Sequence, residues 1–343
     1  MTPLPGGFHA SAPLIIPPMI YRFPRDTDYL PRTKLSYVNL PGILSDGKRD
    51  RQARVPGYVA VQLGERCFLI FMREGEPFYA ARITPQGRGP AALSEVLRLA
   101  GTESERGEGG QIGYFGASEA QQRAMISTLV HPPLPLTEEL DPGRPDRLFP
   151  LLRERGFTGV MELGDGGRRH YLAFEGGAFR TGWFADRDES VPIPEFLRTL
   201  FVAGAVLEAA LYPLLDELPV QAGPGFVDLY RRMIGGTLRE LALASGRETA
   251  LEMMQRGQGL AALHHPVVAA FDITPEGRVM GDPVASPDVL TEGVARWITE
   301  VLIAAADHHG VDPAGVVEKV ARDSRFVLSE HGFFARLPWA LAL

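Results

Sequence analysis

A repeated strand pattern is the feature that most constrains the fold of this 343-residue chain. Residues 57–83 contain three apolar runs separated by short turns rich in glycine and glutamate. About a hundred residues later, residues 159–184 repeat the order strand, turn, strand, turn, strand, with Asp165-Gly166 and Gly176-Gly177 in the turns. Such dipeptides are typical of hairpins, because tight turns need positive φ. The sequence therefore predicts two related β-meanders.

The two copies align when Gly57 is placed on Gly159. One extra residue in the first turn of the second copy then places Phe71 on Phe174, and the last turn is two residues longer in the first copy. The middle strand of the first copy is apolar on both faces, which predicts a central position in the sheet. Cys67, the single cysteine, lies in this strand and is expected to be a small core residue.

Helical patterns surround the two copies. Residues 91–100 and 118–130 follow the first copy, residues 146–153 precede the second, and residues 194–218 predict a long apolar helix after it. Before the first copy, proline and glycine interrupt Leu40–Ile43, so no helix is expected there.

From residue 224 onward helical periodicity takes over. Two helices are predicted over 226–244 and 247–263, followed by a small hairpin within 267–280. Ser286 and Asp312 are predicted to cap two further helices, because each precedes a proline at the first helical position.

These patterns predict an α+β protein, with two related β-meander and helix modules followed by a mainly helical C-terminal domain. We expect a loosely ordered arm at residues 1–34 and a first α/β module at 35–135. A second α/β module is expected at 136–222 and the mainly helical domain at 223–343.

Composition narrows the class of protein. The net charge is −7 and no stripe of lysine and arginine stands out, so no nucleic-acid partner is expected. The longest apolar run, residues 200–215, contains Glu208 and Pro213 and is shorter than the roughly 20 residues of a membrane span. No signal-peptide pattern opens the chain, and a single cysteine fits a reducing compartment, so we expect a cytoplasmic protein.

Catalytic motifs are not evident. Lys48 is the only lysine preceded by glycine, and Arg49 rather than serine or threonine follows it, so no Walker A loop is present. No Gly-x-Ser-x-Gly elbow occurs either. We therefore predict no catalytic, cofactor-binding or metal-binding residues and favour a protein that is not an enzyme. The question stays open, because active sites assembled from distant residues leave no local motif.

Two histidine pairs, His264-His265 and His308-His309, raise the possibility of a metal site. Adjacent histidines on a helix point about 100° apart, so one pair alone is a poor chelator. Each pair ends a predicted helix, where imidazole can meet the last carbonyls and the negative end of the dipole. Helix-end roles are therefore favoured over a metal or proton-transfer site built from both pairs.

Four aromatic residues are candidates for partner binding: Trp183, Phe333, Phe334 and Trp339. Trp183 ends the last strand of the second copy, and the other three follow the last predicted helix. Such residues either close a hydrophobic core, which is the favoured interpretation, or present anchors to another protein.

Residues 146–184 resemble a known family. A short leucine-rich helix leads into Phe157-Thr158-Gly159, an alternating strand and a glycine turn, and Tyr171–Phe174 is followed by Glu175-Gly176-Gly177. This order resembles the PATAN domain, named for the N-terminal region of a cyanobacterial response regulator. Residues 57–83 resemble it through their strands only. The resemblance implies a non-catalytic interaction or signal-input unit of bacterial regulatory systems, often linked with two-component signalling and surface motility, and it supplies no catalytic residues.

We therefore expect a protein that binds another protein of a regulatory system through strand edges and helix faces, without a cofactor. The alternative is a small-molecule sensor or enzyme with a site between the modules, in which arginines hold an anion or nucleotide. Its candidates are Arg168, Arg169, Arg231 and Arg232. A third interpretation is a structural scaffold that forms large homo-oligomers.

Overall fold

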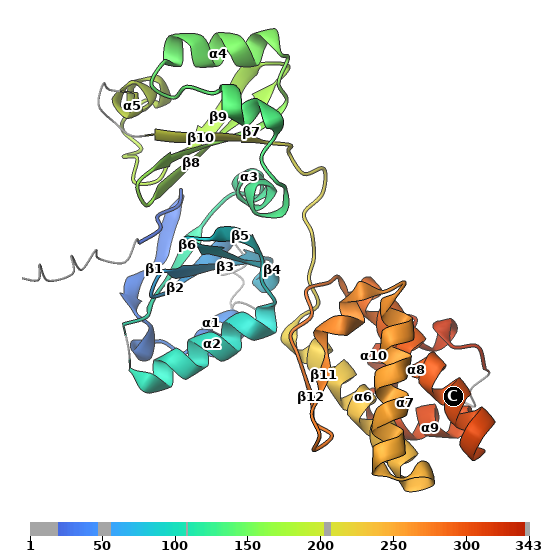
Figure 1. Ribbon diagram of the computed structural model, residues 1–343. Helices are drawn as coiled ribbons and strands as arrows, with labels where there is room; N and C mark the ends of the chain where they lie inside the picture. Colours follow the sequence, from blue (N-terminus) through green and yellow to red (C-terminus); the bar gives the residue numbers. More distant parts are fainter. Residues whose placement is uncertain (1–19, 47–55, 108, 202–206, 340–343) are drawn as a thin grey trace, which may run out of the picture.

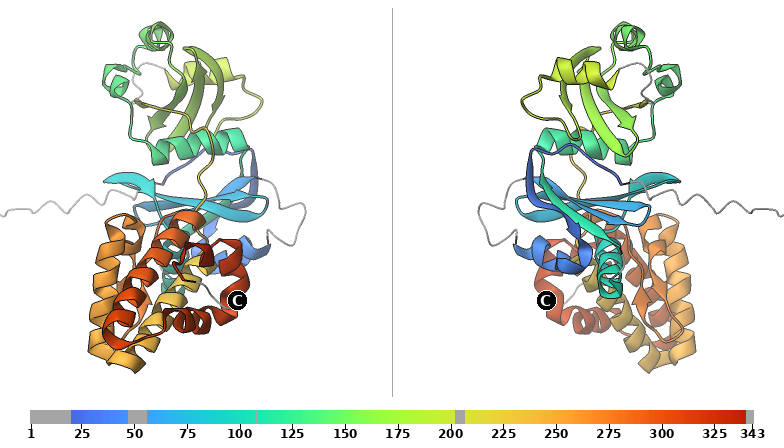
Figure 2. Two further views of the ribbon diagram at one scale, coloured as in Figure 1. Left: turned by 90° about the vertical axis from the view of Figure 1, so that its right-hand side faces the viewer. Right: turned by 90° about the vertical axis from the view of Figure 1, so that its left-hand side faces the viewer.

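The computed structural model describes residues 20–46, 56–107, 109–201 and 207–339. It is an α+β protein, with two antiparallel sheets followed by a helical domain. Figure 1 shows the second sheet standing over the first, with helix α3 (Glu119–Val130) between them. The helical domain lies on the other side of the first sheet from α3, as the turned views in Figure 2 also show.

The first sheet has the strand order β1-β6-β2-β3-β4-β5 and the second has β10-β7-β8-β9. The predicted central position of β3 is confirmed, because it lies between β2 and β4 and is buried on both faces. The strands are β1 (Thr27–Lys34), β2 (Gly57–Leu63), β3 (Arg66–Arg73), β4 (Glu76–Thr84), β5 (Gly87–Pro90), β6 (Gln111–Gly116), β7 (Gly159–Asp165), β8 (Arg168–Glu175), β9 (Ala178–Trp183) and β10 (Leu207–Tyr212).

The two meanders share one register. Gly57 pairs with Met72 in the first copy, and Gly159 pairs with Phe174 in the second, so each partner lies 102 positions further along the chain. A bulge in the next ladder falls immediately before Met72 in one copy and immediately before Phe174 in the other. The predicted match of Phe71 with Phe174 is therefore wrong by one residue. Backbone pairing and turn length set the register, not the position of similar aromatic side chains.

The turns also match. Gly64 and Gly166 both have φ of 57° at the first turn. At the last turn, Glu74 (φ 53°) corresponds to Gly176 (φ 56°), and a glycine with positive φ follows each of them. The last turns are thus equally long, contrary to the prediction. Glu74 occupies a left-handed backbone conformation that the second copy fills with glycine.

Each copy ends with a strand that returns to pair with its first strand. Strand β6 pairs with β2 after helix α2 (Leu93–Arg106), and β10 pairs with β7 after helix α5 (Ile193–Leu200). A Cβ on Gly57 or on Gly159 would lie 2.3 Å from a carbonyl oxygen of the returning strand. Both positions therefore require glycine.

Three predictions about elements are corrected. The long helix at 194–218 is wrong, because α5 ends at Leu200 and β10 completes the second sheet. The loosely ordered arm is wrong for residues 27–34, which form β1 at the edge of the first sheet, while residues 1–19 lie outside the described residues. Helix α1 (Leu40–Asp46) does precede the first copy, since proline is tolerated in the first turn of a helix.

Helices cover the remaining faces of the sheets. Residues of α1 and α2 pack on the first sheet opposite α3. Helix α4 (Pro145–Glu154) and α5 pack on the outer face of the second sheet, around Met161 and Leu172. Each sheet therefore has a core of its own, and α3 fills the space between them.

The helical domain follows the predicted capping pattern. The Ser286 hydroxyl accepts from the Val289 amide, and the Asp312 carboxylate accepts from the amides of Ala314 and Gly315. Within the described residues, none of the helices combines the length and the apolar character that a membrane crossing requires. The elements are α6 (Pro224–Ser245), α7 (Arg247–Ala262), α8 (Pro287–His309), α9 (Pro313–Ala321), α10 (Arg325–Glu330) and a hairpin of β11 (Asp272–Ile273) and β12 (Val279–Met280).

The repeated turn gives a matched pair of substitutions. We expect Glu74→Gly to raise the free energy of unfolding by up to about 1 kcal/mol, because it removes a side chain from the left-handed region. We expect Gly176→Glu to lower it by about 1 kcal/mol. Urea unfolding followed by circular dichroism measures both. A loss of stability in Glu74→Gly would show that contacts of the glutamate outweigh its backbone strain.

Candidate functional site

The two α/β modules are joined by a buried helix. Side chains of α3, among them Met125 and Ile126, pack in one hydrophobic cluster with Phe71 and Phe115 of the first sheet. Val160 of the second sheet belongs to the same cluster. The two sheets therefore share an apolar core across α3 and form one unit.

A buried ion cluster reinforces this joint. Glu162 on β7 is only 4% exposed, and one of its carboxylate oxygens lies 2.5 Å from Nη1 of Arg88 on β5. Nε of Arg169 lies 3.7 Å from the other oxygen. Burial alone would lower the pKa of Arg88, but the charge of Glu162 and the hydrogen bond to it raise this pKa above its usual value. The cluster is thus an internal ion pair that spans the modules.

His170 follows Arg169 on β8 and is fully buried on the opposite face of the second sheet, where its ring packs with Phe184 and Phe196. Its Nδ1 accepts a hydrogen bond from the Ala185 amide at 3.1 Å. Burial, with a contribution from the charge of Arg168, lowers the pKa of His170 to about 4. The imidazole is therefore neutral at pH 7.

The helical domain is joined to the first module by hydrogen bonds and an ion bridge, and the described residues of the two share no apolar core. The chain leaves β10 and runs beside the first module (Figure 1). Gln221 in this segment hydrogen-bonds to the outer side of β4. Its backbone amide donates to the Phe78 carbonyl at 2.8 Å. Its side-chain amide donates to the Ala80 carbonyl at 3.0 Å and accepts from the Ala80 amide at 3.3 Å. Strand β5 pairs with β4 from Ala81 onward, and the Ala91 amide also donates to the Ala80 carbonyl. Gln221 thus continues the cover of this edge past the end of β5.

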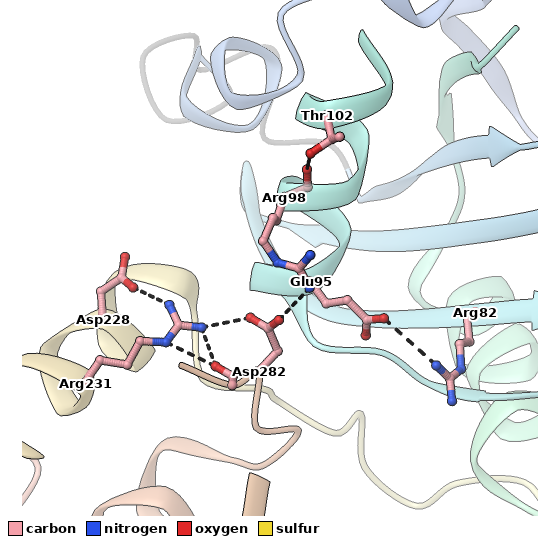
Figure 3. Close-up of polar contacts among 8 residues, drawn as sticks. Arg82, Glu95, Arg98, Thr102, Asp228, Arg231 and Asp282 are labelled. Atoms are coloured by element: carbon pink, nitrogen blue, oxygen red, sulfur yellow. Dashed lines mark hydrogen bonds and ion pairs between the residues drawn. The ribbon is translucent and has the colours of Figure 1, made fainter. Parts of the chain in front are cut away.

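An ion bridge supports the same joint (Figure 3). The Asp282 carboxylate lies 2.9 Å from the guanidinium of Arg98 on α2 and 2.8 Å from that of Arg231 on α6. Arg231 also lies 2.5 Å from Asp228. Burial would raise the pKa of Asp282, but hydrogen bonds and the charges of the two arginines lower it overall. Asp282 therefore holds the helical domain to the first module as a carboxylate.

The second module presents the counterpart of the β4 edge without such an occupant. By the shared register, Gly182 of β9 corresponds to Ala80 of β4, and Trp183 corresponds to Ala81. Phe78 and its neighbours through Ala81 are buried. On β9, Gly182 is buried as well, but Trp183 is partly exposed and Arg180 is exposed. Among the described residues, nothing hydrogen-bonds to the outer backbone edge of β9. Strand β9 is therefore an open edge and the candidate site.

The structure separates the aromatic candidates. Trp183 lies on this edge and packs partly against the core between the modules. Phe333 is 0% exposed inside the helical domain, so it is not a partner anchor and lies in the core, as the favoured interpretation expected. Phe334 and Trp339 are partly buried against the same core.

The other candidate groups do not converge. Arg168 and Arg169 lie in the second module, and Arg231 and Arg232 lie on α6 of the helical domain (Figure 1). Between the modules, where the alternative interpretation placed an anion site, Glu162 pairs with Arg169.

The histidine pairs end α7 and α8 as predicted. His265 contacts Gly293 near the start of α8, about 20 Å along that helix from the second pair. Nor does the described part of the chain bring together three or more His, Cys, Asp or Glu side chains that could hold a metal ion.

Sequence reasoning missed the residues that organise these joints. An acid inside the apolar run of β7 was the available signal for Glu162, since buried carboxylates need a cationic partner. No local signal marks Gln221, because its role depends on the β4 edge about 140 positions earlier in the chain.

Comparison with known proteins finds no matching family model, curated protein or solved structure. The resemblance to the PATAN domain therefore stays a prediction.

Acid should destabilise the protein through His170. The folded state keeps this group neutral down to a pKa of about 4, whereas the unfolded chain protonates it near 6.5. The free energy of unfolding should thus fall by up to roughly 3 kcal/mol as the pH drops from 6.5 to 4. His170→Gln, measured by urea unfolding at several pH values, should flatten this slope. His264→Gln, at an exposed position, serves as the control and should leave this slope unchanged.

Removing the Gln221 side chain should loosen the helical domain. In Gln221→Leu the buried Ala80 amide loses its acceptor, which costs about 1–3 kcal/mol. We expect faster cleavage of residues 213–223 in limited proteolysis and a larger radius of gyration in solution scattering. The neighbouring exposed Val220→Ser is the control. Unchanged protection in Gln221→Leu would show that the Asp282 bridge alone holds the joint.

Proposed function

We propose that the protein is a non-catalytic interaction protein of a bacterial regulatory system, and that it binds an extended segment of a partner protein along β9. The comparison of its own two modules supports this proposal. The outer edge of β4 is covered by β5 and Gln221, and the same edge of the second module has no occupant among the described residues. That difference is the single observation on which the proposal rests.

The chemistry of such an edge is backbone recognition. In β4, the outward groups are the amide and carbonyl of Ala80 and the carbonyl of Phe78. Their counterparts belong to Gly182 and Arg180, so a partner segment would bond to these two residues. Main-chain hydrogen bonds supply affinity in strand addition, and side-chain contacts supply specificity. Trp183 offers the apolar contact at the end of the strand.

The PATAN resemblance of residues 146–184 gives the regulatory context, and the predicted cytoplasmic location stays part of the proposal. The alternative, an anion site between the modules, loses its support because Arg88 and Arg169 already contact Glu162. A buried ion pair of this kind explains the arginines without a ligand.

A proline on the edge tests the proposal. Peptides selected by display on the intact protein should protect the Gly182 amide from hydrogen exchange when they bind. Arg180→Pro places a proline ring in the backbone beside the outward carbonyl of this residue, so it should obstruct a partner strand and weaken peptide binding at least about tenfold. Arg180→Ala keeps the backbone amide and should retain binding. Isothermal titration measures both variants.

Unfolding midpoints equal to wild type show that Arg180→Pro leaves the second module folded. Peptides that bind Arg180→Pro as tightly as wild type and leave the Gly182 amide unprotected would contradict the proposal. So would substrate turnover by the purified protein with no effect of either variant.

A further inference from the structure

The helical domain contains a cleft that shares only Arg231 and Asp228 with the Asp282 bridge. Its volume is about 730 Å³, and it lies between α6, the β11–β12 hairpin and residues 319–324. Cavities that hold small molecules are typically about 300–1,000 Å³. The cleft is therefore large enough for a ligand of nucleotide size.

The charges around the cleft are unbalanced. Five basic and three acidic side chains line it: Arg231, Arg232, Arg239, Arg278, Lys319, Asp228, Glu240 and Asp323. Arg231 pairs with Asp228, and Lys319 lies 2.6 Å from Glu240. For the remaining three arginines the described part of the chain provides no ion pair. Three guanidinium groups thus face one remaining carboxylate, that of Asp323.

The geometry of α6 sets two of these arginines apart. Arg232 and Arg239 are seven residues apart on one face of the helix, about 10 Å along its axis. Gly235 and Gly236 lie between them and present no side chain. Arg278 belongs to the hairpin on another wall of the cleft. An anion beside Gly235 would therefore have one arginine on either side of it along α6 and a third on the hairpin wall.

The two glycines have different reasons for being small. A Cβ on Gly236 would lie 2.6 Å from Val320, so the packing of α9 requires this glycine. A Cβ on Gly235 would meet its nearest neighbour, Val279, only at 3.6 Å, an ordinary contact distance. Packing does not require glycine at 235, where a larger side chain would enter the cleft.

We propose that this cleft binds a small molecule that carries two or more linked phosphate groups. A guanidinium group forms two parallel hydrogen bonds to phosphate oxygens. Two such groups about 10 Å apart along α6, with a third on the hairpin wall, match an oligophosphate better than a single charge. The site goes beyond the interaction along β9, because it lies in another domain and uses none of the same residues.

Titration calorimetry of the full chain tests the assignment. The probes are inorganic triphosphate, adenosine triphosphate and citrate, the last as a multiply charged anion without phosphate. We expect both phosphate probes to bind and citrate to bind at least about tenfold more weakly. Tighter binding of the nucleotide would identify a nucleotide ligand, and equal binding would identify the phosphates as the recognised group.

Variants localise the binding. Arg239→Ala and Arg278→Ala should each weaken triphosphate binding about tenfold. Gly235→Leu should abolish it, with an unfolding midpoint close to wild type. Arg256→Ala, which removes an exposed arginine of α7 outside the cleft, should leave binding unchanged.

Absence of binding by both phosphate probes up to about 1 mM would overturn the proposal. Citrate binding as tight as triphosphate would overturn the phosphate assignment, and equal losses in Arg256→Ala and Arg239→Ala would show a nonspecific charge effect. Arg180→Pro should not alter triphosphate binding. Failure of this site and failure of the β9 site are therefore distinguishable.

Discussion

The backbone groups at the edges of the two sheets need partners, and this requirement organises the chain. A sheet edge presents a row of N–H and C=O groups that will pair with another segment if one is available. In the first sheet, β1 extends one side, while β5 and Gln221 cover the other. In the second sheet, the Leu134 amide donates to the Leu211 carbonyl at the β10 edge. The connections between modules thus also cover edges at β4 and β10, whereas β9 has no such cover among the described residues.

A strand that covers an edge also supplies the counter-charge in the ion cluster between the modules. Glu162 is buried in a strand that is otherwise apolar, which would be costly for a lone carboxylate. Arg88 reaches it from β5, the extra strand of the first sheet, so the element that extends that sheet also supplies the counter-charge. One short strand therefore covers part of an edge and fixes the two modules together.

The sequence was informative where local chemistry decides structure. Glycines in the hairpin turns indicate the repeat, because positive φ excludes most other residues. Ser286 and Asp312 indicate where helices begin, because their side chains accept hydrogen bonds from nearby backbone amides. Prediction from the sequence failed where contacts with distant segments determine the local structure. Leu207–Tyr212 is apolar enough for a helix and becomes a strand only because β7 has an edge to fill. The candidate edge, the cleft and Gln221 likewise depend on contacts that no local window contains.

The side chains on the two matched edges indicate what kind of partner each can have. The β4 edge carries Phe78 and Tyr79, which are buried, so it is suited to a permanently bound segment. The β9 edge carries Arg180 and Thr181 at the corresponding positions, and the arginine is exposed and paired with Glu175. Charged residues and bulges on short edge strands are the devices by which proteins prevent uncontrolled strand pairing. An edge that is open and protected in this way is suited to a partner that binds and dissociates, as signal transfer requires, and less suited to a permanent subunit.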